Sequence, residues 1–185
     1  MESAGEWGIM AGGVKSRAGL PAAAGRHWTI MTSELGRQIG AFLDAHHVMS
    51  LATLGAGGPH ATNLFYDRDG LALLWVSDPD TQHSREIEAD PRVAATVAPD
   101  YTDFAVIRGV QITGAARRIV AADERIRLQA QLEARYAFLG QLASGPPKLR
   151  EAYARTAVYR LQPARIVLID NTKGFGHKET LEISS

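Results

Sequence analysis

The spacing of hydrophobic residues changes along the chain, and each change predicts a different element. Between residues 33 and 46, apolar residues recur at the spacing of one helical face, and Ser33 stands where an N-cap is expected. These apolar residues are Leu35, Ile39, Phe42 and Leu43. Three short strand-like runs follow, separated by Gly- and Asp-rich turns. They span residues 48–54, 60–66 and 71–77. We therefore expect a helix and then a locally paired β-meander.

The second half of the chain mixes strands with longer helical patterns. After the third strand, the pattern predicts six further elements and a short helical turn. The predicted elements are a short polar helix near 81–90, a strand at 92–98, a long β-rich run at 104–120, a helix at 121–142, a helical turn at 149–154, and strands at 157–161 and 165–169. We expect a bulge at Gly109 and a close backbone approach at Gly114. Short strands with helices inserted late favour a mainly β fold, an antiparallel barrel with peripheral helices.

Composition adds limits on class and compartment. The chain has 185 residues, of which 45% are hydrophobic, so one domain with a substantial core is expected. Residues 1–32 are rich in Gly, Ala and Ser and predict a flexible extension, which leaves residues 33–185 as the domain. The 20 basic and 20 acidic residues cancel, which favours neither nucleic acid nor an anionic membrane surface. No run is long and apolar enough to span a bilayer, and no signal peptide pattern is present, so a cytoplasmic protein is the default.

Several common chemistries have no matching residues. The chain has no cysteine, which excludes disulfides and thiolate catalysis. His46 and His47 are adjacent at a helix end, where their side chains diverge, so no metal site is expected. The sequence holds no P-loop and no Gly-x-Ser-x-Gly or His-Glu-x-x-His motif.

The strongest candidate site lies in the segment from Leu73 to Val97, which predicts strand, turn, helix, turn and strand. Hydroxyl and cationic side chains cluster where the helix begins. They are Ser77, Thr81, His83, Ser84 and Arg85. A helix N-terminus presents free N–H groups and a partial positive charge, so this combination suits a phosphate group. For each side chain, a solvated helix face is the alternative interpretation.

The order of elements and motifs resembles the FMN-binding split barrel, the superfamily of pyridoxamine 5′-phosphate oxidase-like proteins. The resemblance covers about residues 33–170 and includes the Asp-Pro-Arg-Val strand start and Gly-Val-Gln-Ile-x-Gly. The string Ile107–Gln111 and the ending Asp-Asn-Thr-x-Gly-Phe-Gly-x-Lys, from Asp170 to Lys178, resemble the poorly characterised YhbP-like branch. An antiparallel split β-barrel of the FMN-binding type is therefore the expected fold.

The resemblance also implies a homodimer with two FMN sites at the subunit interface and a small-molecule substrate. The phosphate would lie at Thr81, His83, Ser84 and Arg85. The ring would lie along the second strand, and the ribityl chain would lie near the end of the third. The matching positions are His60, Ala61, Thr62, Asn63 and Leu64 on the second strand, and Trp75, Val76 and Ser77 on the third. Gln111 would approach from the partner subunit. The Gly174-Phe175-Gly176 tail would form a dimer strap or a lid.

Differences from the biosynthetic oxidases argue against vitamin B6 oxidation. Those enzymes carry basic residues at both ends of the second-strand motif, where this chain has Pro59 and Leu64. Their Ser-Arg-Lys triplet corresponds to His83-Ser84-Arg85, and their Arg-Leu-His substrate signature has no counterpart. The expected function is a flavin-dependent oxidoreductase. The alternatives are a non-catalytic module that binds or senses a flavin, a deazaflavin or haem, and a structural dimer with an empty slot. In the haem case His83, His60 or His177 would be the axial ligand.

Overall fold

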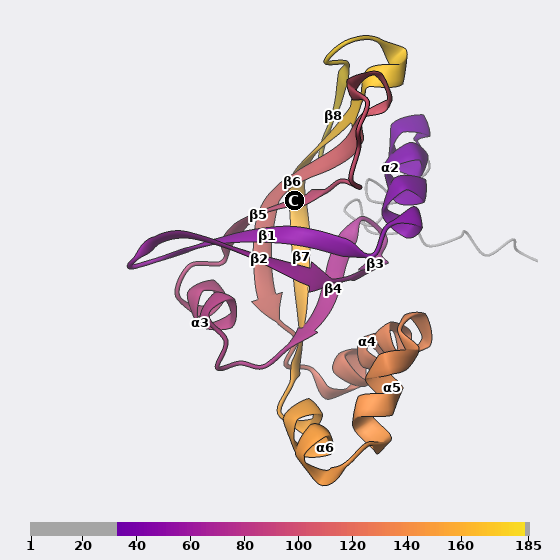
Figure 1. The fold of residues 1–185 in the computed structure, drawn as a ribbon. Coiled ribbons are helices and arrows are strands. Elements are labelled where there is room, and N and C mark those ends of the chain that lie inside the picture. Colours follow the sequence, from indigo (N-terminus) through magenta and orange to yellow (C-terminus); the bar gives the residue numbers. More distant parts are fainter. Residues whose placement is uncertain (1–32, 184–185) are drawn as a thin grey trace, which may run out of the picture.

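The computed structural model describes residues 33–183 of the chain, and within them a curved antiparallel sheet is flanked by helices (Figure 1). The expected N-terminal extension lies outside the described residues. The strands are β1 (Val48–Gly55), β2 (Gly58–Phe65), β3 (Asp67–Asp69), β4 (Ala72–Ser77), β5 (Arg92–Val97), β6 (Arg108–Arg118), β7 (Ala157–Asp170) and β8 (Lys178–Glu182). The helices are α2 (Glu34–Ala45), α3 (Gln82–Ala89), α4 (Ala122–Arg135), α5 (Ala137–Ser144) and α6 (Pro147–Ala154), with short 3₁₀ turns η1 (Phe104–Val106) and η2 (Asn171–Lys173).

The sheet order is β2-β1-β5-β6-β7-β4-β3, with β8 on β7 and every pairing antiparallel. The mainly β, antiparallel barrel is thus confirmed. The expected meander is wrong, because β2 and β4 lie on opposite sides of the sheet order rather than side by side. β4 pairs with the distant β7, where Trp75 lies opposite Tyr159. Among the first four strands, only the β1–β2 and β3–β4 hairpins are local. The ends of this order are β2 and β3, so the barrel is split between β2 and the β3–β4 hairpin.

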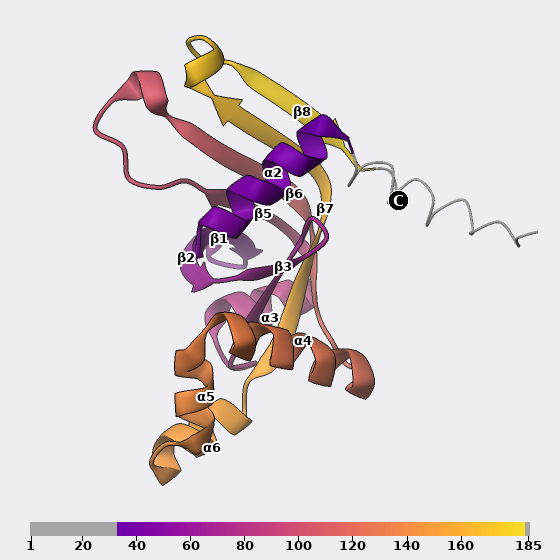
Figure 2. The ribbon, with the colours of Figure 1, turned by 90° about the vertical axis from the view of Figure 1, so that its right-hand side faces the viewer.

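The helical layer lies at one end of the barrel, beside β4 and the lower part of β7 (Figures 1 and 2). The single helix expected at 121–142 is two helices, because Tyr136 is extended at φ −125° and ψ 91° and separates α4 from α5. The Tyr136 hydroxyl donates to the backbone carbonyls of Tyr66 and His47. This tertiary bonding outweighs local helix propensity.

The long strand β7 is continuous through Gln162 and Pro163, where a break was expected. The irregularity lies instead in its pairing with β6, between Thr113 and Gly114, and not at Gly109. The close approach expected at Gly114 is confirmed: a Cβ placed there would lie 2.1 Å from the Gln162 carbonyl oxygen. The bulge lets β7 continue past a proline that cannot donate to the ladder.

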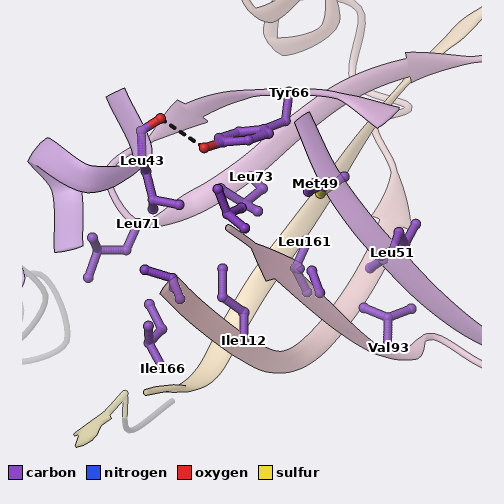
Figure 3. Packing of buried hydrophobic residues seen from close by; sticks show 14 of the residues in the cluster. Leu43, Met49, Leu51, Tyr66, Leu71, Leu73, Val93, Ile112, Leu161 and Ile166 are labelled. Carbon is purple, nitrogen blue, oxygen red and sulfur yellow. Dashed lines mark hydrogen bonds between the residues drawn. The ribbon is translucent and has the colours of Figure 1, made fainter. Parts of the chain in front are cut away.

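Two groups of buried side chains hold these layers together. The barrel interior contains most of the large apolar residues, including Met49, Leu73 and Ile112 (Figure 3). The Tyr66 hydroxyl donates to the Leu43 carbonyl and so anchors α2 over this core. A second cluster, with Leu128 among its buried residues, lies between β4, β7 and helices α4–α6. Side chains on β4 therefore alternate between the barrel and the helical layer.

The segment after β7 forms the turn η2 and the strand β8, which was expected only as a tail. Gly174 and Gly176 have φ of 140° and 69°, values that favour glycine. Phe175 between them is 88% exposed, and its ring meets that of Phe104 edge-on. No helix described is long and apolar enough to cross a membrane.

Candidate functional site

A cavity of about 400 Å³ lies at the split of the barrel. Asn63, Leu64 and Phe65 of β2 line one side, and Val76 of β4 lines the other. Side chains of α4, α5 and α6 close the end of the cavity, and Asp78 lies in the loop that leads to α3. The volume is within the range of small-molecule sites, roughly 300–1,000 Å³. Three residues expected to bind a cofactor, Asn63, Leu64 and Val76, are thus brought together.

Strand β2 presents two different faces, as its sequence predicts. His60, Thr62 and Leu64 are half-buried on one face, and Ala61 and Asn63 are exposed on the other. Because β2 pairs only with β1 among the described strands, its second backbone edge faces the split. An unpaired strand edge offers N–H and C=O groups to a ligand.

The three residues expected near the end of β4 have separate environments. Trp75 is fully buried, and its ring stacks on Tyr159 with centroids 5.7 Å apart. It belongs to the barrel core and does not line the cavity, so a contact between its side chain and a ligand is not supported. Val76 lines the cavity, and Ser77 is buried beneath α3. Of these three side chains, Val76 alone is placed to meet a molecule in the cavity.

The hydroxyl and imidazole groups at the start of α3 bond mainly to one another. The Ser77 Oγ lies 2.7 Å from His83 Nε2, and the Thr81 Oγ1 lies 3.2 Å from the same nitrogen. The Thr81 hydroxyl also lies 2.8 Å from the Ser84 hydroxyl. His83 and Ser84 are buried, at 6% and 0% exposure. Their side chains point into the protein, so the exposed position considered for His83 is wrong.

Burial is the main cause that lowers the pKa of His83 below its ordinary value of 6.5, and the nearby His60 imidazole lowers it further. The Glu86 carboxylate has the opposite, smaller effect. The imidazole is therefore neutral at neutral pH and supplies no positive charge to the loop.

The remaining cation, Arg85, is exposed and lies over the first turn of α3. Its guanidinium donates to the backbone carbonyl of Asp80. The N-cap Thr81 makes no side-chain bond to a helix N–H group. The N–H groups of the first turn are consequently available to an anion, with Arg85 beside them.

Gln111 lies on the exposed convex side of the sheet, which we call the outer sheet face. The register aligns Asn63, Ser50, Thr96 and Gln111 across β2, β1, β5 and β6. A second row of small residues runs beside this one. It consists of Ala61, Ala52, Ala94 and Thr113. A shallow hollow of about 240 Å³ lies over these small side chains.

Sequence patterns did not indicate a polar cluster between α3 and the β1–β2 hairpin. The Glu86 carboxylate accepts from Thr53 at 2.5 Å and lies 3.2 Å from His60 Nδ1. Hydrogen bonds from Thr53 and Gln82 lower the pKa of Glu86. His60 and Glu86 lie 26 residues apart in the sequence. The one sequence signal for their contact was that the strand and helix patterns place both side chains on inward-facing positions. Within residues 33–183 no group of three or more His, Cys, Asp or Glu side chains could hold a metal ion.

The contribution of the helical layer to the cavity was also missed. The sequence predicted only peripheral helices in this region, without a part in a site. The side chains of this layer that line the cavity include Leu132, Tyr136, Phe138, Leu139 and Tyr153. The signal that could have found it is structural: Phe138 is 38% exposed although it lies within an apolar helical segment.

The model for pyridoxamine 5′-phosphate oxidase matches residues 35–170. The chain belongs to the pyridoxamine 5′-phosphate oxidase family. Within this family it is similar to a UPF0306 protein of Klebsiella pneumoniae, with 31% identity over 142 residues that cover 76% of this chain and 88% of the relative. The UPF0306 protein YhbP of Salmonella paratyphi A is 32% identical over 144 residues, with the same coverage. The expected similarity to the YhbP-like branch is confirmed.

Solved structures of the pyridoxamine 5′-phosphate oxidase family share the fold. A putative pyridoxamine 5′-phosphate oxidase from Listeria innocua aligns with a TM-score of 0.58 and 21% identity, over 73% of this chain and 98% of that one. The conserved hypothetical protein Rv2991 from Mycobacterium tuberculosis aligns with a TM-score of 0.62 and 22% identity, over 83% of this chain and 93% of that one. HutZ of Vibrio cholerae, described as a haem storage protein, aligns with a TM-score of 0.56 and 17% identity, over 71% of this chain and 91% of that one. These similarities establish the split barrel and no more.

Proposed function

We propose that this protein binds FMN in the split of the barrel and acts as a flavin-dependent oxidoreductase on a small molecule. The observation that carries the proposal is the cavity itself, where the free edge of β2 faces the end of β4 and the loop to α3. When bound, the flavin would supply hydride or electron transfer. The protein's part is to hold the flavin, to orient its ring and to exclude water.

The ring end of the flavin fits the residues present. The unpaired edge of β2 offers backbone hydrogen-bonding groups to a planar heterocycle, and Leu64 and Val76 provide apolar surface on two sides. Asn63 adds a side-chain amide at the cavity wall, where its Oδ1 already accepts from Ser50 at 2.7 Å. These groups are consistent with a ring along β2 as the family resemblance implies.

The phosphate end has fewer charges than its sequence suggested. The supporting groups are the uncapped first turn of α3 and the Arg85 guanidinium, while His83 and Ser84 stabilise the loop from beneath. We infer one charged contact to the phosphate, from Arg85, because the other candidate cation, His83, is neutral. Affinity for FMN should accordingly depend strongly on Arg85.

The first test is the visible spectrum of the full-length protein and a titration with FMN. Flavin absorption in the purified protein, or saturable quenching of FMN fluorescence on titration, is the expected result. Arg85→Ala should weaken binding by about 1.5–3 kcal/mol, the scale of a charged hydrogen bond. Arg92→Ala is the matched control, because Arg92 is exposed at the opposite end of α3 and pairs with Asp90. No binding by the wild type would refute the flavin assignment, and equal losses in both variants would remove Arg85 from the site.

Haem is a second candidate ligand, because HutZ and a heme binding protein of Mycobacterium smegmatis share the fold. The described residues favour flavin over haem in this cavity. None of the lining residues is a histidine, and His83 Nε2 is bonded to Ser77. His60 and His177 lie beside Glu86 and Glu179. A haem titration monitored at the Soret band separates the two, since a sharp, saturable Soret shift with no response to FMN would favour haem.

We also propose that two copies of the chain associate through the outer sheet face. Its small and polar side chains form a flat surface, and the exposed apolar residues Val48, Leu54 and Phe65 lie along its edges. This arrangement would bring Gln111 of one copy toward the β2 edge of the other, as the family resemblance implies.

A further inference from the structure

The wall of the cavity has an unusual chemistry for a family named after a phosphorylated vitamin. Its lining is dominated by aliphatic and aromatic side chains, and none of the lining residues within 33–183 is a Lys, Arg or His. The polar side chains among the lining residues, apart from two tyrosines, are Asn63, Asp78 and Thr156. A phosphate in such a site would be desolvated without a cation to compensate it, which is costly.

The tyrosine hydroxyls do not supply the missing polarity, because both are engaged away from the cavity. The Tyr136 hydroxyl donates to backbone carbonyls of Tyr66 and His47. The Tyr153 hydroxyl donates to Glu133 Oε1 at 2.7 Å. Their rings therefore act as flat apolar surface, together with Phe65 and Phe138, whose centroids lie 5.1 Å apart. Stacked and edge-to-face rings are suited to an aromatic or otherwise flat guest.

Among the described residues of the lining, the one charged side chain is negative. Asp78 accepts from the Asp80 backbone N–H group at 2.9 Å and lies 3.4 Å from Arg155 Nε. Arg155 does not line the cavity, and its side chain is 61% exposed. Asp78 consequently repels an anionic ligand at the mouth of the cavity and favours a neutral one or one with a donor group.

We propose that this cavity binds an uncharged, largely apolar aromatic molecule as the substrate of the flavin site and disfavours phosphorylated or other anionic substrates. The phosphate of the flavin itself is assigned to the first turn of α3, whose residues do not line the cavity. The proposal rests on the proposed function, because Asn63 and Leu64 belong both to this wall and to the strand assigned to the flavin. A guest in the cavity would lie against the end of β2 and thus beside the ring.

Two fluorescent probes that differ by one charge test this class directly. They are N-phenyl-1-naphthylamine, which is neutral, and its 8-sulfonate, which is anionic. We expect saturable fluorescence enhancement with the neutral probe and binding at least about tenfold weaker with the sulfonate. Asp78→Asn should lower the ratio of the two dissociation constants by about threefold, because it removes the repulsion between Asp78 and the sulfonate. The control Asp80→Asn changes an exposed residue of the same loop outside the lining and should leave the ratio unchanged.

Steric variants on one helix locate the bound probe. Ala152 lines the cavity, whereas Ala154 is exposed on the same helix outside the lining. Ala152→Phe should weaken binding of the neutral probe about tenfold, because the larger side chain fills the cavity. Ala154→Phe should bind the probe as the wild type does. Circular dichroism of both variants checks that they fold.

The outcomes separate this inference from the flavin assignment. Three results would overturn the substrate class. They are equal binding of the two probes, displacement of the neutral probe by pyridoxal 5′-phosphate, and an unchanged affinity of Ala152→Phe for the neutral probe. If FMN fails to bind while the neutral probe behaves as expected, the cofactor assignment falls and the cavity chemistry stands. Normal FMN titration of Ala152→Phe, with the neutral probe weakened, supports both.

Discussion

At the scale of single residues, His83 controls the shape of the loop that begins α3. Its buried imidazole lies 2.7 Å from the Ser77 Oγ and 3.2 Å from the Thr81 Oγ1, so it links the end of β4 to the N-cap of the helix. A neutral imidazole shares its Nε2 between the two hydroxyls without the desolvation cost of a charge. The arrangement positions the first-turn N–H groups while leaving the positive charge to Arg85.

Because the native pKa of His83 is lowered from 6.5, the unfolded chain takes up this proton at a higher pH than the folded chain. Stability should therefore be complete above about pH 6.5 and decline as the pH falls below that value. The groups that face the imidazole are Ser77, Thr81, His60 and Glu86. His83→Gln keeps a hydrogen-bonding group near Ser77 and removes the titration.

Thermal unfolding from pH 7.5 to 5.5 measures this difference. The melting temperature of the wild type should fall more steeply than that of His83→Gln, although the variant is less stable at pH 7.5. The comparison between the two proteins cancels the other histidines and carboxylates. Parallel pH profiles would show that His83 titrates normally in the folded protein.

At the scale of elements, the bulge between β6 and β7 depends on the absence of a side chain at Gly114. A Cβ there would lie 2.1 Å from the Gln162 carbonyl oxygen, and backbone atoms cannot easily move away. At Gly109 on the same strand the corresponding atom would lie 3.4 Å from the Val97 carbonyl oxygen, an ordinary contact. The two glycines thus provide a test and its control within one strand.

We expect Gly114→Ala to destabilise the protein by about 1–3 kcal/mol, the range for overpacking. Gly109→Ala should change stability by less than about 1 kcal/mol. Urea unfolding followed by circular dichroism measures both. Similar midpoints for the two variants would contradict the close approach at Gly114.

The elements themselves were largely predictable, because periodicity and turn residues are local properties. Ser33 caps α2 by accepting from Gly36 at 3.0 Å, and α3 ends at Asp90 before Pro91, as the sequence indicated. The failures were non-local. The break at Tyr136 follows from a bond to Tyr66, and the pairing of β4 with β7 joins segments about 85 positions apart. The cavity was missed for the same reason, since β2 and three later helices form it together.

At the scale of the whole molecule, the outer sheet face is left uncovered by the helices that the structure describes. The helical layer and α2 lie elsewhere on the sheet (Figures 1 and 2), while the rows through Ser50 and Ala52 are open. Small side chains at Ala52, Ala61 and Ala94 allow close approach of a second flat surface. The hollow above them is too shallow to enclose a ligand alone, but a second copy would close it.

The proposed dimer predicts a specific response to a charge on this face. Ala94 is half-buried and lies opposite Ala52 and Thr113 at the centre of the rows. Ala94→Glu should place unpaired carboxylates in the interface and shift the protein from dimer to monomer, because a buried charge without a partner is strongly unfavourable. Ala130→Glu, at an exposed position on α4, should leave the dimer intact. Sedimentation velocity at micromolar concentration distinguishes the two species.

If Gln111 completes the flavin site across this interface, Ala94→Glu should also lower FMN affinity in step with the loss of dimer. A monomeric wild type that binds FMN fully would show that one chain suffices.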